Sequence, residues 1–165
     1  MIKQIISSLF VLGLLLTVSP VFAQSKAVKQ KETDDKLLTE YFALHNIQPT
    51  KTRSGLYYVI SRPGTGKNAW RGQTVTVNYT GRLLDGTTFD SNLDTSFGHT
   101  QPLPFEVGMG RVIKGWDEGV QLMNTGSKAT FYIPSGLAYG EKSVGTAIPS
   151  NSILIFDVAL LSIDK

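Results

Sequence analysis

The segment that most constrains this chain is RVIKGWDEG, residues 111–119. Its apolar residues begin a series with the helical period, Ile113, Trp116, Val120 and Met123. Gly126 follows closely, and a glycine just beyond the last turn is the usual left-handed end of a helix. The sequence therefore predicts a short helix with an indole near its start.

Away from this helix the apolar residues change to an alternating period, which is typical of strands with one buried face. The alternating positions are Val75, Val77 and Tyr79, then Ala129, Phe131 and Ile133, and finally Leu154, Phe156, Val158 and Leu160. Asp85-Gly86 predicts a hairpin, because a primed turn needs positive φ at both central residues. An antiparallel sheet with one face against a short helix is an α+β fold.

The first 23 residues have the pattern of an export signal. Lys3 precedes a mostly apolar run from Ile5 to Val18, and small residues lead to Ala23, after which we place the cleavage. A retained anchor is the alternative, but the run is shorter than the roughly 18 residues that span a bilayer. We therefore expect no stable membrane span after cleavage and an extracytoplasmic protein, either periplasmic or secreted.

The length fits one domain with an extension. Of the 165 residues, 142 remain once the 23 of the signal are removed, and we expect an extension over 24–53 and a domain over 54–165. One of the 16 basic residues lies in the signal, which leaves 15 against 13 acidic ones. These charges are scattered, so the sequence predicts no nucleic-acid surface. There is no cysteine, which excludes disulfides and a lipid-modified cysteine.

Within the extension, residues 24–30 are small or charged and predict a flexible leader. Residues 34–46 predict a helix, with Asp34 and Asp35 at its start and Asn46 near its end. Its apolar side would carry Leu37, Leu38, Tyr41, Leu44 and His45. Two interpretations stay open: an arm that contacts clients or forms a homodimer, or a helix that packs on its own domain.

Motifs of nucleotide, metal and covalent chemistry are incomplete. Gly64 to Lys67 lacks the rest of a phosphate loop, and Gly108 to Gly110 lacks the third glycine of a dinucleotide fingerprint. His45 and His99 have no ligand spacing for zinc. Ser135 has no nucleophile-elbow pattern around it. We therefore expect no metal, no cofactor and no covalent catalysis.

Four segments resemble the signature segments of FKBP-type peptidyl-prolyl cis-trans isomerases. In chain order they are VNYTGRLLDGTTFD (77–90), RVIKGWDEGV (111–120), IPSGLAYG (133–140) and AIPSNSILIFDVALL (147–161). The resemblance runs from about Gly55 to the C-terminus. It implies an antiparallel sheet of five to six strands curved around one short helix, and an apolar pocket that binds a proline ring.

By resemblance, Trp116 is the floor of this pocket and the backbone N–H of Ile113 holds the substrate carbonyl. The Tyr139 hydroxyl makes a second hydrogen bond, and Tyr79 and Asp90 complete the catalytic set. An alternative role for Asp90 is to orient the tyrosine hydroxyls. The other implied substrate-binding residues are Phe89, Leu103, Phe105, Val112, Ile148 and Phe156.

The sequence departs from the family pattern in three places. The segment from Asp90 to Phe105 is a few residues longer than in compact members and holds no arginine to pair with Asp90. Leu103 stands where an aromatic residue often lines the pocket, with Phe97 as a nearby substitute. Residues 141–147 offer no large aromatic lip. These departures bear on substrate preference and inhibitor affinity.

The resemblance implies an isomerase that speeds X–Pro rotation in exported proteins. Its partners would be proline-containing or unfolded polypeptides and the macrolide inhibitors of the family. The alternative is a catalytically weak binding module or holdase for unfolded chains, which the extension and the altered segment before Phe105 favour. Deletion of residues 24–48 would separate the two functions.

Overall fold

The structure is a computed structural model that describes residues 20–164. The predicted export signal lies outside the described residues, except for Pro20 to Ala23, which begin the first helix. Among residues 20–164, no helix combines the length and the apolar character that crossing a bilayer requires.

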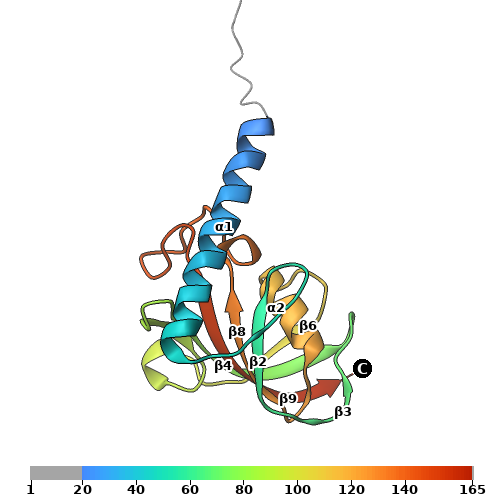
Figure 1. Ribbon diagram of the computed structural model, residues 1–165. Helices are drawn as coiled ribbons and strands as arrows, with labels where there is room; N and C mark the ends of the chain where they lie inside the picture. The colour runs from blue at the N-terminus through green and yellow to red at the C-terminus, as the bar shows by residue number, and fades with distance from the viewer. Residues whose placement is uncertain (1–19, 165) are drawn as a thin grey trace, which may run out of the picture.

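Seven antiparallel strands form the main sheet, which curves around a short helix (Figure 1). The sheet order is β1 (Thr50–Lys51), β2 (Tyr57–Arg62), β8 (Lys128–Ile133), β9 (Leu154–Asp164), β4 (Thr74–Leu83) and β5 (Thr88–Ser91). The seventh strand, β6 (Leu103–Glu106), pairs with the first half of β4, and β5 pairs with its second half. A separate pair joins β3 (Thr65–Asn68) to β7 (Asn124–Thr125).

The α+β class is therefore confirmed, but the expected count of five to six strands was too low. The two-residue strand β1 has no alternation of its own, so no pattern identifies it. β4 also pairs with two short strands, β5 and β6. This pairing depends on tertiary contacts, so the local alternation of apolar residues does not predict it.

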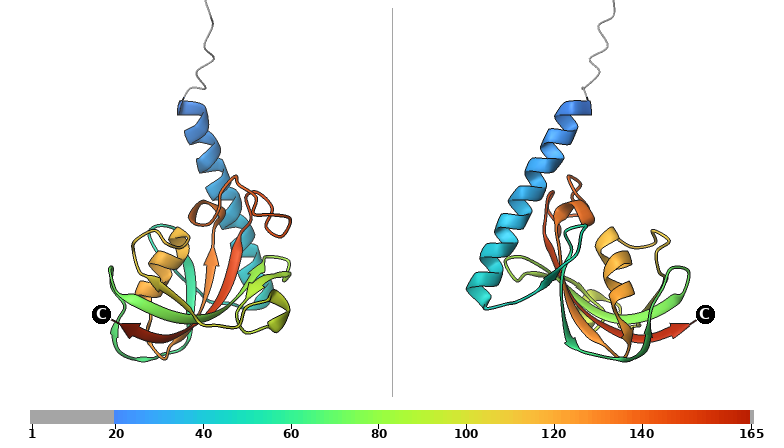
Figure 2. Two further views of the ribbon diagram at one scale, coloured as in Figure 1. Left: turned by 180° about the vertical axis from the view of Figure 1, so that it is seen from behind. Right: turned by 45° about the vertical axis from the view of Figure 1, so that its right-hand side comes forward.

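The inner face of the sheet packs against α2 (Lys114–Gly119), and this contact holds the main core (Figure 2). Every predicted alternating apolar position of β4, β8 and β9 is buried there. On the helical side, Trp116, Val120 and Met123 are also buried in this core, while Ile113 is partly buried at its margin. The predicted inward face of each strand and of the helix is confirmed.

Part of the outer face of the sheet is covered by α1 (Pro20–His45), which crosses it with its C-terminal half (Figures 1 and 2). Phe42 packs between two strand tyrosines, with ring centroids 5.0 Å from Tyr57 and 4.9 Å from Tyr132. Leu38 joins this second core, whose strand residues are Tyr57, Tyr132, Ile153 and Ile155. β8 and β9 therefore bury side chains on both faces where α1 crosses them, and this half of the helix packs on its own domain.

The prediction for the extension was wrong in its start and in part of its face, although Leu38 and Tyr41 do pack in the second core. The helix runs through residues 24–30, whose alanine, lysine and glutamine residues are good helix formers, so the leader is not irregular. Asp34 lies in the middle of the helix and is buried, whereas Leu44 is 78% exposed. The end at Asn46 is confirmed by its left-handed φ of 54°. A buried aspartate shifts the inward face away from the one that apolar spacing indicates.

The Asp85-Gly86 hairpin is confirmed, but its turn is not primed. The Gly86 N–H donates to the Leu83 carbonyl at 3.0 Å, and the Leu83 N–H donates to Thr87 at 2.9 Å. Of the pair, only Gly86 has positive φ, at 89°. Gly86 therefore follows the turn as a left-handed bulge residue and does not occupy a central position.

The predicted glycine stop of the core helix was also misplaced. α2 ends at Gly119 and continues as a 3₁₀ turn, η2 (Val120–Leu122). Gly126 does have a left-handed φ of 84°, but it follows β7, and its N–H donates to the Leu160 carbonyl at 2.8 Å. A strand of two residues thus separates the helix from the glycine.

Asp35 gives a test of how α1 is attached to the sheet edge. Its carboxylate pairs with Lys51 and accepts the Tyr57 hydroxyl at 2.7 Å. The hydrogen bond from Lys51, and then that from Tyr57, holds the pKa of Asp35 below its ordinary value. A carboxyl with a lowered pKa adds stability above its ordinary pKa and loses it as the pH falls through the lowered one.

Asp35→Asn is therefore expected to lower the free energy of unfolding by roughly 0.5 kcal/mol near neutral pH, because a half-exposed pair is screened by solvent. The difference should be smaller at about pH 3, which lies below the ordinary carboxyl pKa of 3.8. Urea unfolding at both pH values measures it, with Glu40→Gln as a control on the same helix. An equal loss at both pH values would contradict this role.

Candidate active site

A cleft of about 200 Å³ opens between the inner face of the sheet and the segment before α2. The sheet contributes residues from β4, β5, β6 and β9, and the opposite wall comes from the turn after β8. The lining residues are Tyr79, Asp90, Leu103, Arg111, Val112, Ile113, Trp116, Tyr139 and Phe156. Most of this lining is apolar or aromatic, which suits a compact apolar ligand.

Trp116 is the floor of the cleft and is 3% exposed. Its ring lies edge-to-face with Tyr79 (5.2 Å, 82°) and Phe156 (5.0 Å, 86°), and tilted against Phe105 (5.8 Å, 50°). Such arrangements are the favoured aromatic geometries. Three strands therefore fix the plane of the indole from three sides.

Two glycines seat the helix that carries Trp116. A Cβ on Gly115 would lie 2.5 Å from Ile133 Cγ2, and one on Gly119 would lie 2.8 Å from Phe131 Cζ. No side chain fits at either position, so α2 lies directly on β8. This close approach brings the indole down to the level of the strand aromatics.

Asp117 fixes the loop that leads into α2. Its Oδ1 accepts the Gly108 N–H at 2.9 Å and its Oδ2 accepts the Gly110 N–H at 2.8 Å. Ile113 then has extended backbone, with φ −60° and ψ 151°, at the N-cap of α2. Its N–H forms no hydrogen bond within residues 20–164, so this donor at the cleft wall is available to a ligand.

Asp90 is the one carboxylate among the cleft-lining residues. The Tyr79 hydroxyl donates to Oδ2 at 2.7 Å, and His99 Nε2 lies 2.8 Å from Oδ1. Burial, and then the hydrogen bond to Asp90, raises the pKa of Tyr79 above its ordinary value. Tyr79 therefore remains a protonated donor at neutral pH.

Eight of the eleven sequence-predicted site residues line the cleft. Of the other three, Phe105 packs beneath Trp116 and Phe89 packs edge-to-face on Phe156 at 5.5 Å. Ile148 is buried in the same core, where it forms a β-bridge with Val144. Phe105 and Phe89 thus contact side chains that line the cleft, whereas Ile148 is a buried residue of the same core.

Two residues of the site did not follow from the residue patterns. Arg111 lines the cleft, and its place directly before Val112 was the available signal. His99 contacts Asp90 from the segment between β5 and β6, where no motif marks it. Leu103 does line the cleft, whereas Phe97 is not among the lining residues.

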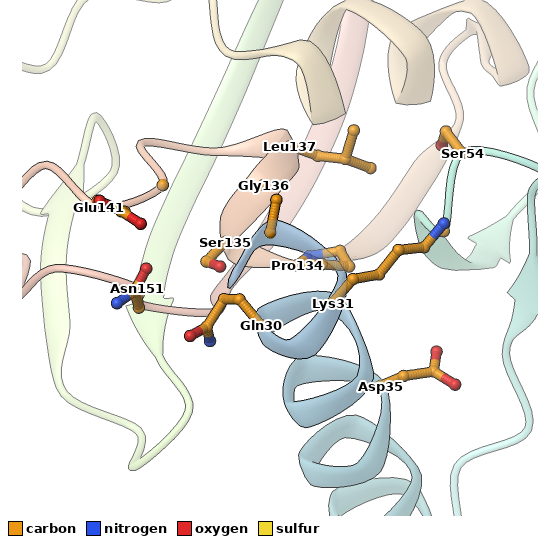
Figure 3. A pocket seen from close by; sticks show the side chains of 13 residues that line it. Gln30, Lys31, Asp35, Ser54, Pro134, Ser135, Gly136, Leu137, Glu141 and Asn151 are labelled. Carbon is orange, nitrogen blue, oxygen red and sulfur yellow. The ribbon is translucent and has the colours of Figure 1, made fainter. Parts of the chain in front are cut away.

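A second cavity, of about 270 Å³, lies between α1 and the turn after β8 (Figure 3). Gln30 and Lys31 line it from the helix, and Pro134 to Leu137 line it from the turn. None of the sequence-predicted site residues lines it. Within residues 20–164, no group of three or more histidine and acidic side chains is placed to hold a metal ion.

Sequence comparisons give consistent matches. A family model described as FKBP-type peptidyl-prolyl cis-trans isomerase matches residues 66–161, which include all eleven predicted site residues. The FKBP-type peptidyl-prolyl cis-trans isomerase FkpA of Aeromonas hydrophila is 44% identical over 144 residues, which are 86% of this chain and 51% of that protein. FK506-binding protein 2 of Yarrowia lipolytica is 45% identical over 115 residues, 70% of this chain and 77% of that protein.

Solved structures agree. FkpA from Escherichia coli matches with a TM-score of 0.67 and 35% identity, over 86% of this chain and 64% of that chain. AtFKBP13 matches with a TM-score of 0.65 and 35% identity, over 70% of this chain and 98% of that chain. This chain spans about half the length of the curated FkpA relatives that it matches.

Proposed function

This chain belongs to the family of FKBP-type peptidyl-prolyl cis-trans isomerases, and we propose that it speeds rotation about X–Pro bonds in exported polypeptides. The observation that carries the proposal is the aromatic cleft above Trp116, enclosed by Tyr79 and Phe156. A proline ring is a compact apolar group, and a cleft of about 200 Å³ can enclose it.

The reaction needs no nucleophile. Amide resonance gives the X–Pro bond a rotational barrier of about 18–20 kcal/mol. The twisted transition state loses this resonance and much of the charge separation of the planar amide. An apolar cleft that excludes water therefore disfavours the planar amide relative to the twisted one, and a fixed shape can favour the twisted form further.

The polar groups at the rim position the substrate. The unpaired Ile113 N–H is suited to hold the substrate carbonyl, and the Tyr139 hydroxyl, on a side chain that is 40% exposed, is suited to make a second hydrogen bond. Asp90 accepts the Tyr79 hydroxyl, which supports its role in orienting that ring over direct contact with the reacting bond.

We infer export from the pattern of residues 1–23, which would place the protein in a periplasm or outside the cell. A homodimer through the extension stays a prediction, and the part of α1 that reaches beyond the sheet is the segment it would use (Figure 1). Several relatives are named FK506-binding proteins, so this macrolide is a suitable competitive probe of the cleft.

The test is isomerisation of a short X–Pro peptide by the purified protein, with and without FK506. Spontaneous isomerisation takes roughly 10–100 s. We expect the protein to shorten this time, and we expect FK506 to abolish the acceleration. A folded protein that gives no acceleration would contradict the proposal and favour the binding module. Protection of an unfolded client by that same sample would then measure the alternative function.

Tyr139→Phe tests the second hydrogen bond. Removal of one hydroxyl is expected to lower kcat/KM by about three- to tenfold, because a single hydrogen bond contributes roughly 0.5–1.5 kcal/mol. Tyr41→Phe, on α1 and away from the cleft, is the matched control and should keep the parent rate. Equal rates for Tyr139→Phe and the parent would remove this hydroxyl from the mechanism.

A further inference from the structure

A chain of contacts links His99 to the floor of the cleft. His99 Nε2 lies 2.8 Å from Asp90 Oδ1, and the Tyr79 hydroxyl donates to the other oxygen of the same carboxylate at 2.7 Å. The Tyr79 ring meets Trp116 edge-to-face at 5.2 Å. The imidazole therefore lies one carboxylate away from the tyrosine that bounds the substrate site.

The segment that presents His99 is anchored. Asn92, which is 2% exposed, accepts the Tyr79 N–H at 2.8 Å and donates to the carbonyls of Val77 (3.2 Å) and Gln101 (3.1 Å). Gly98 follows the 3₁₀ turn η1 (Thr95–Phe97) and has a left-handed φ of 78° directly before His99. Both ends of the segment and its turn are thus held, and the imidazole is aimed at Asp90.

His99 is the only basic side chain that pairs with Asp90 among residues 20–164. Arg111 and Tyr139 line the same cleft without a bond to this carboxylate, and Tyr79 faces it from β4. Asp94, on the same segment, is occupied as the cap of η1, where it accepts the Ser96 N–H at 2.9 Å. The charge opposite Asp90 therefore depends on one imidazole.

An imidazole is the side chain that changes charge between about pH 5 and pH 8. When it is protonated, its N–H to a carboxylate is a charge-assisted hydrogen bond, which is stronger and shorter than a neutral one. When it is neutral, it still fits the site but holds the carboxylate less firmly. A change in the charge of His99 would therefore change the restraint on Asp90 and, through it, on Tyr79.

We propose that His99 is a positioning residue of the isomerase cleft, which orders Asp90 and Tyr79 and makes turnover depend on pH. The inference rests on the proposed function. It predicts higher kcat/KM at the acidic end of the range, where the imidazolium and the carboxylate are both charged.

The test is kcat/KM for an X–Pro peptide without titrating groups, measured from about pH 5.5 to pH 8 at constant ionic strength. The parent rate should fall by about two- to fivefold as the pH rises, the size expected for a half-exposed pair. His99→Arg should give a flat profile at the upper level, and His99→Gln a flat profile at the lower level. His45→Gln, which alters the other of the two histidines, should follow the parent.

Thermal unfolding of each variant checks that the fold is kept, which the 44% exposure of the His99 side chain favours. A parent profile without a decline, or a decline that persists in His99→Gln, overturns the role of His99 and leaves the isomerase function standing. No acceleration by the folded parent at any pH would instead overturn the proposed function on which the inference rests.

Discussion

Trp116→Leu is expected to lower kcat/KM for an X–Pro peptide by about 10- to 100-fold while the protein still folds. The indole has three ring partners, Tyr79, Phe105 and Phe156. Each such pair contributes roughly 0.5–1.5 kcal/mol beyond area burial, and all three are lost together. Leucine keeps the site apolar but leaves a deeper and less defined floor, so the twisted amide is held less closely.

The control is Trp70→Leu, because the chain has two tryptophans and Trp70 is 55% exposed outside the cleft. Peptide isomerisation and FK506 binding should be unchanged in this variant. Both readouts should weaken in Trp116→Leu, with thermal unfolding as the check on folding. A Trp116→Leu protein that keeps the parent kcat/KM would show that the indole is only part of the core.

Asp34→Ala is expected to lower the free energy of unfolding by about 2–4 kcal/mol. Asp34 is 1% exposed, and its Oδ2 accepts both the N–H (2.8 Å) and the hydroxyl (2.6 Å) of Ser135. Gln30 Nε2 donates to Oδ1 at 2.8 Å. Truncation leaves the two donors of the fully buried Ser135 without a partner in the protein, which costs more than the loss of a solvated bond.

Chemical denaturation measures this loss, and Asp35→Ala is its control at the next position of the same helix. Because Asp35 is half-exposed, its removal should cost no more than about 1 kcal/mol. Hydrogen exchange gives a local readout, since the N–H groups of Ala138 and Gly140 both bond to the Ser135 carbonyl. Equal stability of the two alanine variants would contradict the assignment of Asp34 as the buried link.

Local sequence patterns were sufficient to predict the buried residues of strands in which apolar and polar residues alternate. The period of two in β4, β8 and β9 identified the inner core residues, because each inward position is buried in the same core. The outer face could not be predicted in this way. Tyr132 and Ile155 occupy its alternate positions and are buried only because α1 lies over them.

Side-chain contacts show the same difference between what sequence patterns predict and what tertiary contacts decide. The resemblance placed eight residues in the cleft, since its segments carry Trp116 and the aromatics around it. The resemblance did not predict the contacts of His99 and Asp34, because each of these residues bonds to a partner from another element. For Asp34 that partner lies 101 residues away in the chain. An acidic residue in a helix is normally read as solvent-facing, and only the position of Ser135 reverses that reading.

The place of β9 in the sheet has a consequence for biosynthesis. This strand occupies residues 154–164 and lies between β8 and β4, with which it forms two full ladders. It also supplies Phe156 to the cleft. A ribosome releases these residues after all the others of the domain, so the nascent chain can assemble neither the centre of the sheet nor the cleft beforehand. A protein proposed to assist the folding of others would thus complete its own folding only once β9 is available.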